Sequence, residues 1–184
     1  MTCILFGMDA DSFWQLIDRA RAEAGLSGDA TADRAIDLLA AMPTEEIVTA
    51  HQLLWDQLAQ SYVAPLWAAA YIINGGCSDD MFEYFRGWLI TQGRDALERA
   101  LTDPDSLADV SAVQAAAAAR DDLECELTPA IARVAFRRAT GQELPVDTWR
   151  GSYPSLGGDF WFDFEDGDRL NQKLPKLAAL HART

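Results

Sequence analysis

Cysteine and histidine are scarce in this chain. Its 184 residues include three cysteines and two histidines, and neither type recurs at the short spacings that hold zinc. An odd number of cysteines also forms no disulfide framework, so we expect reduced thiols and a cytoplasmic protein. We therefore predict neither a metal site nor a cofactor from these residues.

The short motifs of common enzyme classes are also missing. The sequence has no glycine-rich phosphate loop, no dinucleotide fingerprint, no nucleophile elbow and no helical pair of metal-binding histidines. Cys77 precedes an expected helix start, where a thiol can lose its proton more easily, but the neighbouring Asp79 and Asp80 oppose the thiolate. These absences favour a non-enzymatic protein over an enzyme.

Positive charge is in short supply. Fifteen lysines and arginines face 29 aspartates and glutamates, which gives a formal net charge of -14. Direct binding to nucleic acid or to anionic membranes needs basic patches, so we expect neither partner. No apolar run approaches the roughly 20 residues that cross a bilayer, and the first seven residues lack the features of a signal peptide. A basic protein remains a possible partner.

Apolar and aromatic residues are plentiful instead. Hydrophobic residues make up 49% of the chain and include six tryptophans, enough for the core of one domain. Helical spacing of apolar residues recurs along the chain, whereas no strand signal or internal repeat appears. We therefore predict an all-α fold, a single compact multi-helix domain. Helices are expected at residues 10–24, 32–42, 43–62, 63–73, 78–92, 95–101, 111–127 and 129–141.

Residues 63–73 form the most apolar segment, and we expect them to be a buried core helix around which the others pack. Asn74 and two glycines then end this helix, because these residues tolerate a left-handed backbone. Ser78 is a good N-cap for the next helix, and Asp79 and Asp80 place negative charge in its first turn. Residues 63–92 are therefore the predicted centre of the fold.

The 78–92 helix has two chemically different faces. Projected at about 100° per residue, Phe82 and Phe85 lie on the apolar side with Met81, Trp88 and Leu89. Asp79, Asp80, Glu83 and Gly87 lie on the other side, and Arg86 falls at the seam. One hypothesis is a capped helix with a solvated face and a Glu83–Arg86 pair. The other is a polar cluster that lines a cleft and binds a ligand or partner.

The candidate binding residues follow from the second hypothesis. They combine the polar cluster with aromatic and amide side chains of the preceding helix and turn. The set is Trp67, Tyr71, Asn74, Asp79, Asp80, Glu83 and Arg86. A phosphate is not expected there, because the two carboxylates in the first turn would repel it. On the 43–62 helix, His51 lies on the apolar side, where we expect a hydrogen-bonded core histidine and not a catalytic base.

The C-terminal part is less regular. Prolines and glycines dominate residues 142–158, which we expect to be a loop. Residues 159–168 interleave aromatic and acidic side chains, which could pack on the helices or meet a partner. The segment from Arg169 onward contains basic residues and no acid, so it can fold back on the acidic surface.

Three segments carry a family resemblance. They are Leu66 to Gly93, Asp11-Ser-Phe-Trp-Gln-Leu-Ile-Asp near the start, and Asp103-Pro-Asp-Ser-Leu-Ala after the second glycine turn. Together they resemble the bacterial family called domain of unknown function 4240 (DUF4240), over roughly residues 8–141. The resemblance implies a cytoplasmic α-helical domain and no particular activity. Asn74-Gly75-Gly76 followed by aromatic residues is also similar to a motif of acidic bacterial DNA-mimic proteins.

These observations predict a domain layout and a ranking of functions. We expect an N-terminal extension at 1–8, a helical domain at 9–141, and an irregular extension at 142–184 that packs on it. The leading hypothesis is a non-enzymatic ligand-binding, regulatory or protein-interaction module. A first alternative is an acidic, DNA-mimic-like decoy for a basic protein. A second is an enzyme that uses Asp79, Asp80 or Glu83 as acid, base or ligands for a divalent metal.

Overall fold

The computed structural model describes residues 7–25, 27–146, 150–156, 164 and 166–182. Within these ranges the chain is helical and contains no strand, so the predicted all-α fold is confirmed. The α-helices are α1 (Ala10–Ala24), α2 (Gly28–Ala40), α3 (Thr44–Gln60), α4 (Ala64–Ile73), α5 (Asp79–Thr91), α6 (Arg94–Thr102), α7 (Ser111–Ala119), α8 (Ile131–Thr140), α9 (Gly167–Lys173) and α10 (Pro175–Leu180). Two short 3-10 helices are η1 (Pro104–Asp109) and η2 (Thr128–Ala130).

Helix ends follow the expected capping chemistry. The side chain of Asp9 accepts a hydrogen bond from the backbone N–H of Ser12, and that of Ser78 accepts one from Met81. Each cap satisfies a backbone donor that the helix itself leaves unpaired. Gly93, with φ of +92°, occupies the turn between α5 and α6, as the predicted end of the 78–92 helix requires.

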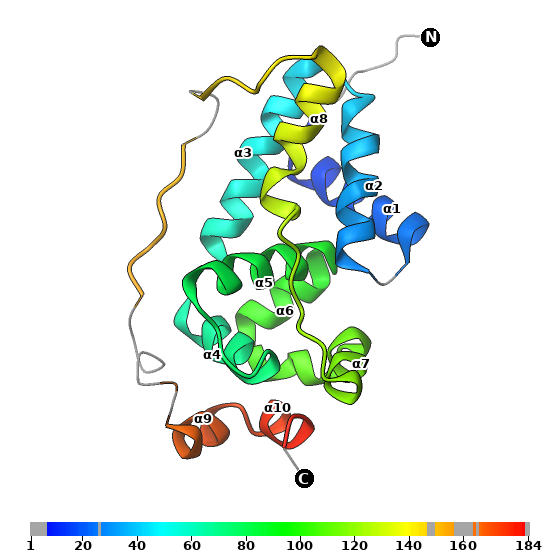
Figure 1. Ribbon diagram of the computed structural model, residues 1–184. Coiled ribbons are helices and arrows are strands. Elements are labelled where there is room, and N and C mark those ends of the chain that lie inside the picture. The colour runs from blue at the N-terminus through cyan, green and yellow to red at the C-terminus, as the bar shows by residue number, and fades with distance from the viewer. Residues whose placement is uncertain (1–6, 26, 147–149, 157–163, 165, 183–184) are drawn as a thin grey trace.

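The helices form two groups on either side of α5 (Figure 1). Helices α1, α2, α3 and α8 pack against one another in one group, and α4, α6, α10 and η1 pack together in the other. Helix α5 contacts both groups, including α1, α2 and α3 on one side and α4 and α6 on the other. Every residue from Phe85 to Gly93 is buried.

The predicted arrangement around residues 63–73 therefore needs one refinement. Helix α4 buries Leu66, its alanines and Ile73, but Trp67, Tyr71 and Ile72 remain partly exposed. The central helix is α5, whose second half is buried on all sides. Gly87 was expected on the polar face but is buried. The carbonyl oxygen of Cys125 approaches it so closely that an added Cβ atom would lie 2.6 Å from that oxygen.

The predicted 111–127 helix is too long. Helix α7 ends at Ala119, and Arg120 caps it in the left-handed conformation with φ of +61°. Residues 121–125 instead run across α5, where the N–H of Cys125 donates to the carbonyl of Tyr84 at 2.9 Å. Four acids between 121 and 126 disfavour continued packing of the alanine helix against the core.

Two other helix starts also differ from expectation. Helix α2 begins at Gly28, four residues earlier than predicted, because Ser27 caps it through the N–H of Ala30. Thr128 does not cap a helix: its hydroxyl lies 3.1 Å from the thiol sulfur of Cys125, and the 3-10 turn η2 precedes α8. Both differences come from side-chain hydrogen bonds that compete with the backbone.

Two short helices lie within the C-terminal region that was expected to be irregular. The carboxylate of Asp105 in η1 accepts hydrogen bonds from the backbone N–H groups of Lys176 and Leu177, both at 3.0 Å. The Lys176 ammonium also lies 3.2 Å from the carboxylate of Asp109. These contacts attach α10 to η1, and α10 also packs against α4. Most of residues 159–168 fall outside the described ranges.

Candidate functional site

Arg86 is the most unusual side chain of the α5 helix. It was expected at the seam between two faces, yet it is 1% exposed and is the largest fully buried side chain of the described residues. Helix α5 turns it toward the last turn of α3. Burying a guanidinium is costly unless its charge and its N–H groups are compensated.

Backbone carbonyls supply part of this compensation. The Nε–H of Arg86 donates to the carbonyl of Phe82, one turn earlier in α5, and its Nη1 donates to the carbonyl of Leu58. Leu58 lies in the final turn of α3, where carbonyls lack helical partners and the helix dipole favours a cation. Arg86 thus caps the C-terminal end of α3.

Three aromatic rings supply the rest. The Arg86 guanidinium carbon lies 5.0 Å from the ring centroid of Tyr62, 4.9 Å from that of Phe82 and 4.9 Å from that of Tyr153. Cation–π attraction to such rings is stronger where water is excluded. We call Arg86, Tyr62, Phe82 and Tyr153 the arginine cage. No carboxylate within the described part of the chain forms a salt bridge with Arg86.

Tyr153, the third ring of the cage, comes from a distant part of the chain. Residues 150–156 have no regular secondary structure and run along the outside of the molecule, in gold in Figure 1. The side-chain amide of Gln52 on α3 holds the backbone of Arg150 through two hydrogen bonds of 2.8 and 2.9 Å. The Tyr153 ring stacks on Tyr62 with centroids 4.6 Å apart, yet it is 41% exposed. We call residues 150–156 the strap.

Glu83 joins the cage through Tyr153. Its carboxylate accepts a hydrogen bond from the Tyr153 hydroxyl at 3.2 Å, and it forms no salt bridge with Arg86 in the described chain. The intrahelical Glu83–Arg86 pair, which was one hypothesis from the sequence, is therefore not formed within the described chain. Burial raises the pKa of Tyr153, while the nearby guanidinium of Arg86 opposes that rise.

The other candidate residues have separate roles. Trp67 stacks on Phe82 with centroids 4.6 Å apart, and its indole N–H donates to the carbonyl of Cys77. Asn74 pairs its side-chain amide with the backbone of Leu123 and so fixes the segment that crosses α5. The ring of Tyr71 lies 5.9 Å from that of Phe164, outside the cage. Only Trp67, Glu83 and Arg86 of the predicted set come together at the cage.

Asp79 and Asp80 are exposed at the start of α5. Neither forms a hydrogen bond or salt bridge through its side chain within the described ranges, and both add negative charge to that end of α5. Among the residues described, no group of three or more histidine, cysteine, aspartate or glutamate side chains is placed to hold a metal ion.

Cys77 is a poor nucleophile. Burial, together with the negative charge of Glu124, raises the pKa of its thiol to about 12, and Arg86 lowers that pKa only in part. At neutral pH the thiol therefore stays protonated, and the thiolate is the reactive form. This agrees with the expectation that the acids after Cys77 oppose its ionisation.

Sequence reasoning missed Tyr62 and Tyr153. Tyr62 falls at the end of the helix predicted at 43–62, where nothing distinguished it from other apolar residues, and Tyr153 lies in a segment without periodicity. The signal that pointed to the site was a lone arginine at the border of an apolar helix face. Its partners could not be found, because they come from segments 24 and 67 residues away in the chain.

Comparisons with known proteins identify the family. The sequence profile described as "Protein of unknown function (DUF4240)" matches residues 8–138. No curated protein and no solved structure shows a significant match. None of the helices within the described ranges combines the length and the apolar character that a bilayer crossing requires. The matched region covers α1 to most of α8 and ends before the strap. This chain belongs to the DUF4240 family.

Proposed function

We propose that this protein is an interaction module whose receptor site is the arginine cage, and that the cage binds an aromatic side chain of an extended segment. One observation carries the proposal: a buried guanidinium without a salt bridge is closed by Tyr153, a partly exposed residue from outside the family region. Residues 8–138 alone supply Arg86 and the rings of Tyr62 and Phe82 but lack the third ring of the cage.

The strap contacts the helices as a bound peptide would. The side-chain amide of Gln52 donates to the carbonyl of Arg150 and accepts from its backbone N–H. A single strap side chain, that of Tyr153, enters the cage. Backbone pairing with one aromatic anchor is a common mode of peptide recognition. Because the strap is joined to the domain, its high effective concentration favours the closed form over a competing segment.

Charge indicates what kind of segment competes. Glu83 accepts the hydroxyl of Tyr153, and exposed Asp79 and Asp80 lie in the preceding turn of the same helix. Asp56 is exposed on α3, one turn after Gln52, whose side-chain amide also donates to it at 2.7 Å. With a net charge of -14 for the whole chain, this surface favours a basic segment that presents a tyrosine-like ring.

A peptide added in trans tests the proposal. The variant Tyr153→Ala should bind a synthetic Arg-Gly-Ser-Tyr-Pro-Ser-Leu peptide with a dissociation constant on the order of 1 mM or below. The wild type should bind it at least about tenfold more weakly, because its own Tyr153 occupies the cage. Chemical-shift changes of the indole N–H signals of Trp55 and Trp67 report the binding.

Two controls make the result specific. The variant Ser155→Ala changes an exposed strap residue and should behave like the wild type. A peptide with alanine in place of tyrosine should not bind any variant. Replacing both serines of the peptide by lysine should tighten binding at low salt, an advantage that screening by about 0.5 M NaCl removes. Equal binding to wild type and Tyr153→Ala, or no binding to either, would refute the proposal.

A further inference from the structure

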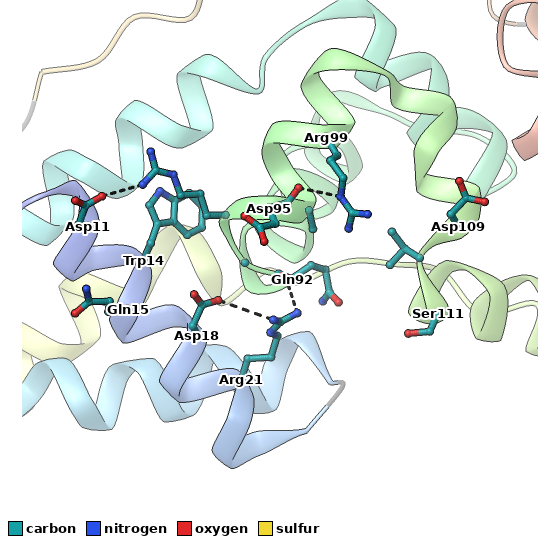
Figure 2. A pocket seen from close by; sticks show the side chains of 14 residues that line it. Asp11, Trp14, Gln15, Asp18, Arg21, Gln92, Asp95, Arg99, Asp109 and Ser111 are labelled. Carbon is teal, nitrogen blue, oxygen red and sulfur yellow. Dashed lines mark hydrogen bonds and ion pairs between the residues drawn. The ribbon is translucent and has the colours of Figure 1, made fainter.

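A second cleft lies at the C-terminal end of α5, between α1, α6 and the start of α7 (Figure 2). Its volume is about 670 Å³, within the range of sites that hold small metabolites. Trp14, which is 5% exposed, forms part of its apolar wall, while the remaining lining is mostly polar. None of the residues of the arginine cage takes part in it.

The charges of this cleft are almost all paired. Arg21 lies 3.9 Å from Asp18, and Arg94 lies 2.8 Å from Asp11. Asp109 is paired with Lys176. Two lining residues of opposite charge are left, Asp95 and Arg99, and neither forms a salt bridge within the described ranges. The Nε–H of Arg99 donates to the backbone carbonyl of Asp95, which leaves its terminal nitrogens available.

An amide side chain lines the cleft beside these charges. Gln92 is 6% exposed, and its side chain points into the cleft (Figure 2). Its Nε2 donates to the hydroxyl of Thr91, which in turn donates to the carbonyl of Trp88, so the orientation of the amide is determined. The Oε1 oxygen of Gln92 consequently faces the cleft without a hydrogen-bond donor in the described chain. An amide oxygen in this position can accept a hydrogen bond from a ligand in the cleft.

The starts of two helices also line the cleft. Neither α6 nor α7 has a side-chain cap at its N-terminus, so backbone N–H groups remain unpaired there. Asp95 occupies the first turn of α6 and disfavours an anion at that end. No acidic residue occupies the first turn of α7, which begins at Ser111. An anionic group is therefore favoured near Ser111 and Arg99, and a cationic group near Asp95 and Gln92.

We propose that this cleft binds a small zwitterion of the α-amino-acid class. Its carboxylate is held by the Arg99 guanidinium and by the first N–H groups of α7. Its ammonium donates to the Asp95 carboxylate and to the Oε1 oxygen of Gln92. One unpaired charge of each sign beside an amide oxygen without a donor matches a ligand with one anionic and one donating cationic end.

The full-length protein can be screened against each of the twenty standard L-amino acids at about 5 mM by thermal shift and calorimetry. At least one should raise the melting temperature and bind with a dissociation constant of roughly 1 mM or lower. Its N-acetyl and carboxamide derivatives each lack one charge and should bind about tenfold more weakly or worse.

Variants assign the binding to the cleft. Arg99→Gln and Asp95→Asn alter exposed side chains, so the fold should persist, and each should weaken binding about tenfold or more. Arg137→Gln removes an exposed arginine of α8 outside the cleft and should leave binding unchanged. The proposal is overturned if no amino acid binds the wild type, or if both cleft variants bind as the wild type does. Tyr153→Ala should not affect this binding, which separates the outcome from that of the strap experiment.

Discussion

At the scale of single residues, Arg86 and His51 are both polar groups taken into the core, and they are accommodated differently. Arg86 places its guanidinium at the C-terminal end of α3 and between aromatic rings. His51 is 3% exposed on the buried side of α3, and its ring lies 6.3 Å from that of Trp55. Burial, and to a lesser extent Arg133, lowers the pKa of His51 to about 4, so its neutral form is the native one.

His51 should make stability depend on pH. Its pKa is about 4 in the folded protein and about 6.5 when unfolded, so the unfolded chain binds the proton more tightly between these values. The stabilisation is complete above pH 6.5 and is lost as the pH falls toward 4. From pH 7 to pH 5 the loss from this group is on the order of 2 kcal/mol.

Urea unfolding of the wild type and of His51→Gln at pH 7 and at pH 5 measures this loss of stability. The wild type should lose about 2 kcal/mol more than the variant on acidification, while changes common to both proteins belong to other groups. A pH dependence that is identical in the two proteins would show that His51 is not held neutral by the fold.

At the scale of elements, α5 is packed on both sides in its second half. The segment that follows α7 crosses it at Gly87, where the Cys125 carbonyl and the Thr128 side chain would lie 2.6 and 3.1 Å from an added Cβ. The first contact is to backbone, so it cannot be relieved by a side-chain rotation. The φ of Gly87 is not in the left-handed region, so the backbone conformation does not require glycine there. Glycine is required because another segment approaches so closely.

Gly87→Ala should therefore destabilise the protein by roughly 2 to 4 kcal/mol, although alanine is the better helix former. Unfolding in urea gives the change in free energy. Gly167→Ala is the matched control, because nothing lies within 4 Å of an added Cβ there and Gly167 is already in helix α9. Equal stability of Gly87→Ala and the wild type would show that the crossing segment moves away at little cost.

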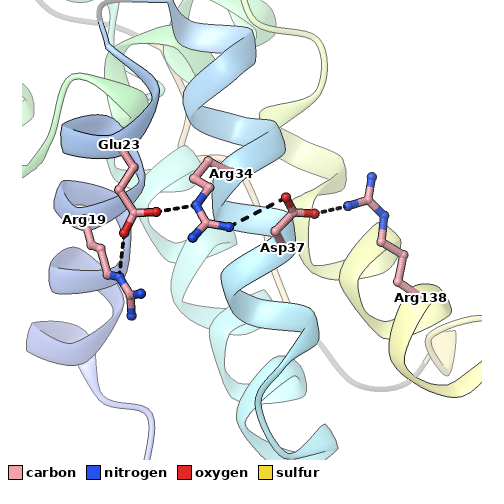
Figure 3. A network of polar contacts seen from close by, with 5 residues as sticks. All are labelled: Arg19, Glu23, Arg34, Asp37 and Arg138. Carbon is pink, nitrogen blue, oxygen red and sulfur yellow. Dashed lines mark hydrogen bonds and ion pairs between the residues drawn. The ribbon is translucent and has the colours of Figure 1, made fainter.

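At the scale of the whole molecule, a row of ion pairs joins the outer surfaces of α1, α2 and α8 (Figure 3). Arg19 and Arg34 both bond the carboxylate of Glu23, Arg34 also approaches Asp37, and Arg138 pairs with Asp37. These side chains are at least one-third exposed, so each pair adds little stability by itself. The row does link helices that are distant in sequence.

The carboxyl group of Glu23 reports whether this row exists in solution. Hydrogen bonds from Arg19 and then Arg34 lower its pKa in the folded protein. Its contribution to stability is therefore present above the unfolded pKa and is lost as the pH falls through the folded one. Arg34→Gln should raise the Glu23 pKa in an NMR titration of the carboxyl carbon, whereas Arg137→Gln should not. An unchanged pKa in Arg34→Gln would rule out the contact between Glu23 and Arg34.

Local patterns in the sequence were sufficient for much of the fold. The helix that begins after Ser78 and the turn at Gly93 were predicted correctly, because capping and left-handed turns depend on residues within one helical turn. Trp67, Glu83 and Arg86 were also singled out from local patterns, since a polar cluster on one predicted helix followed aromatic side chains of the preceding one.

Only the tertiary structure decided what those residues contact. After α7 ends at Ala119, the following segment crosses α5 and buries Gly87, and the central position of α5 comes from its contacts with both helix groups. The closure of the cage by Tyr153 depends on a strap with no periodicity of its own. Periodicity records which side of a helix is buried, but the partner on that side is set by packing between distant segments, which no local pattern encodes.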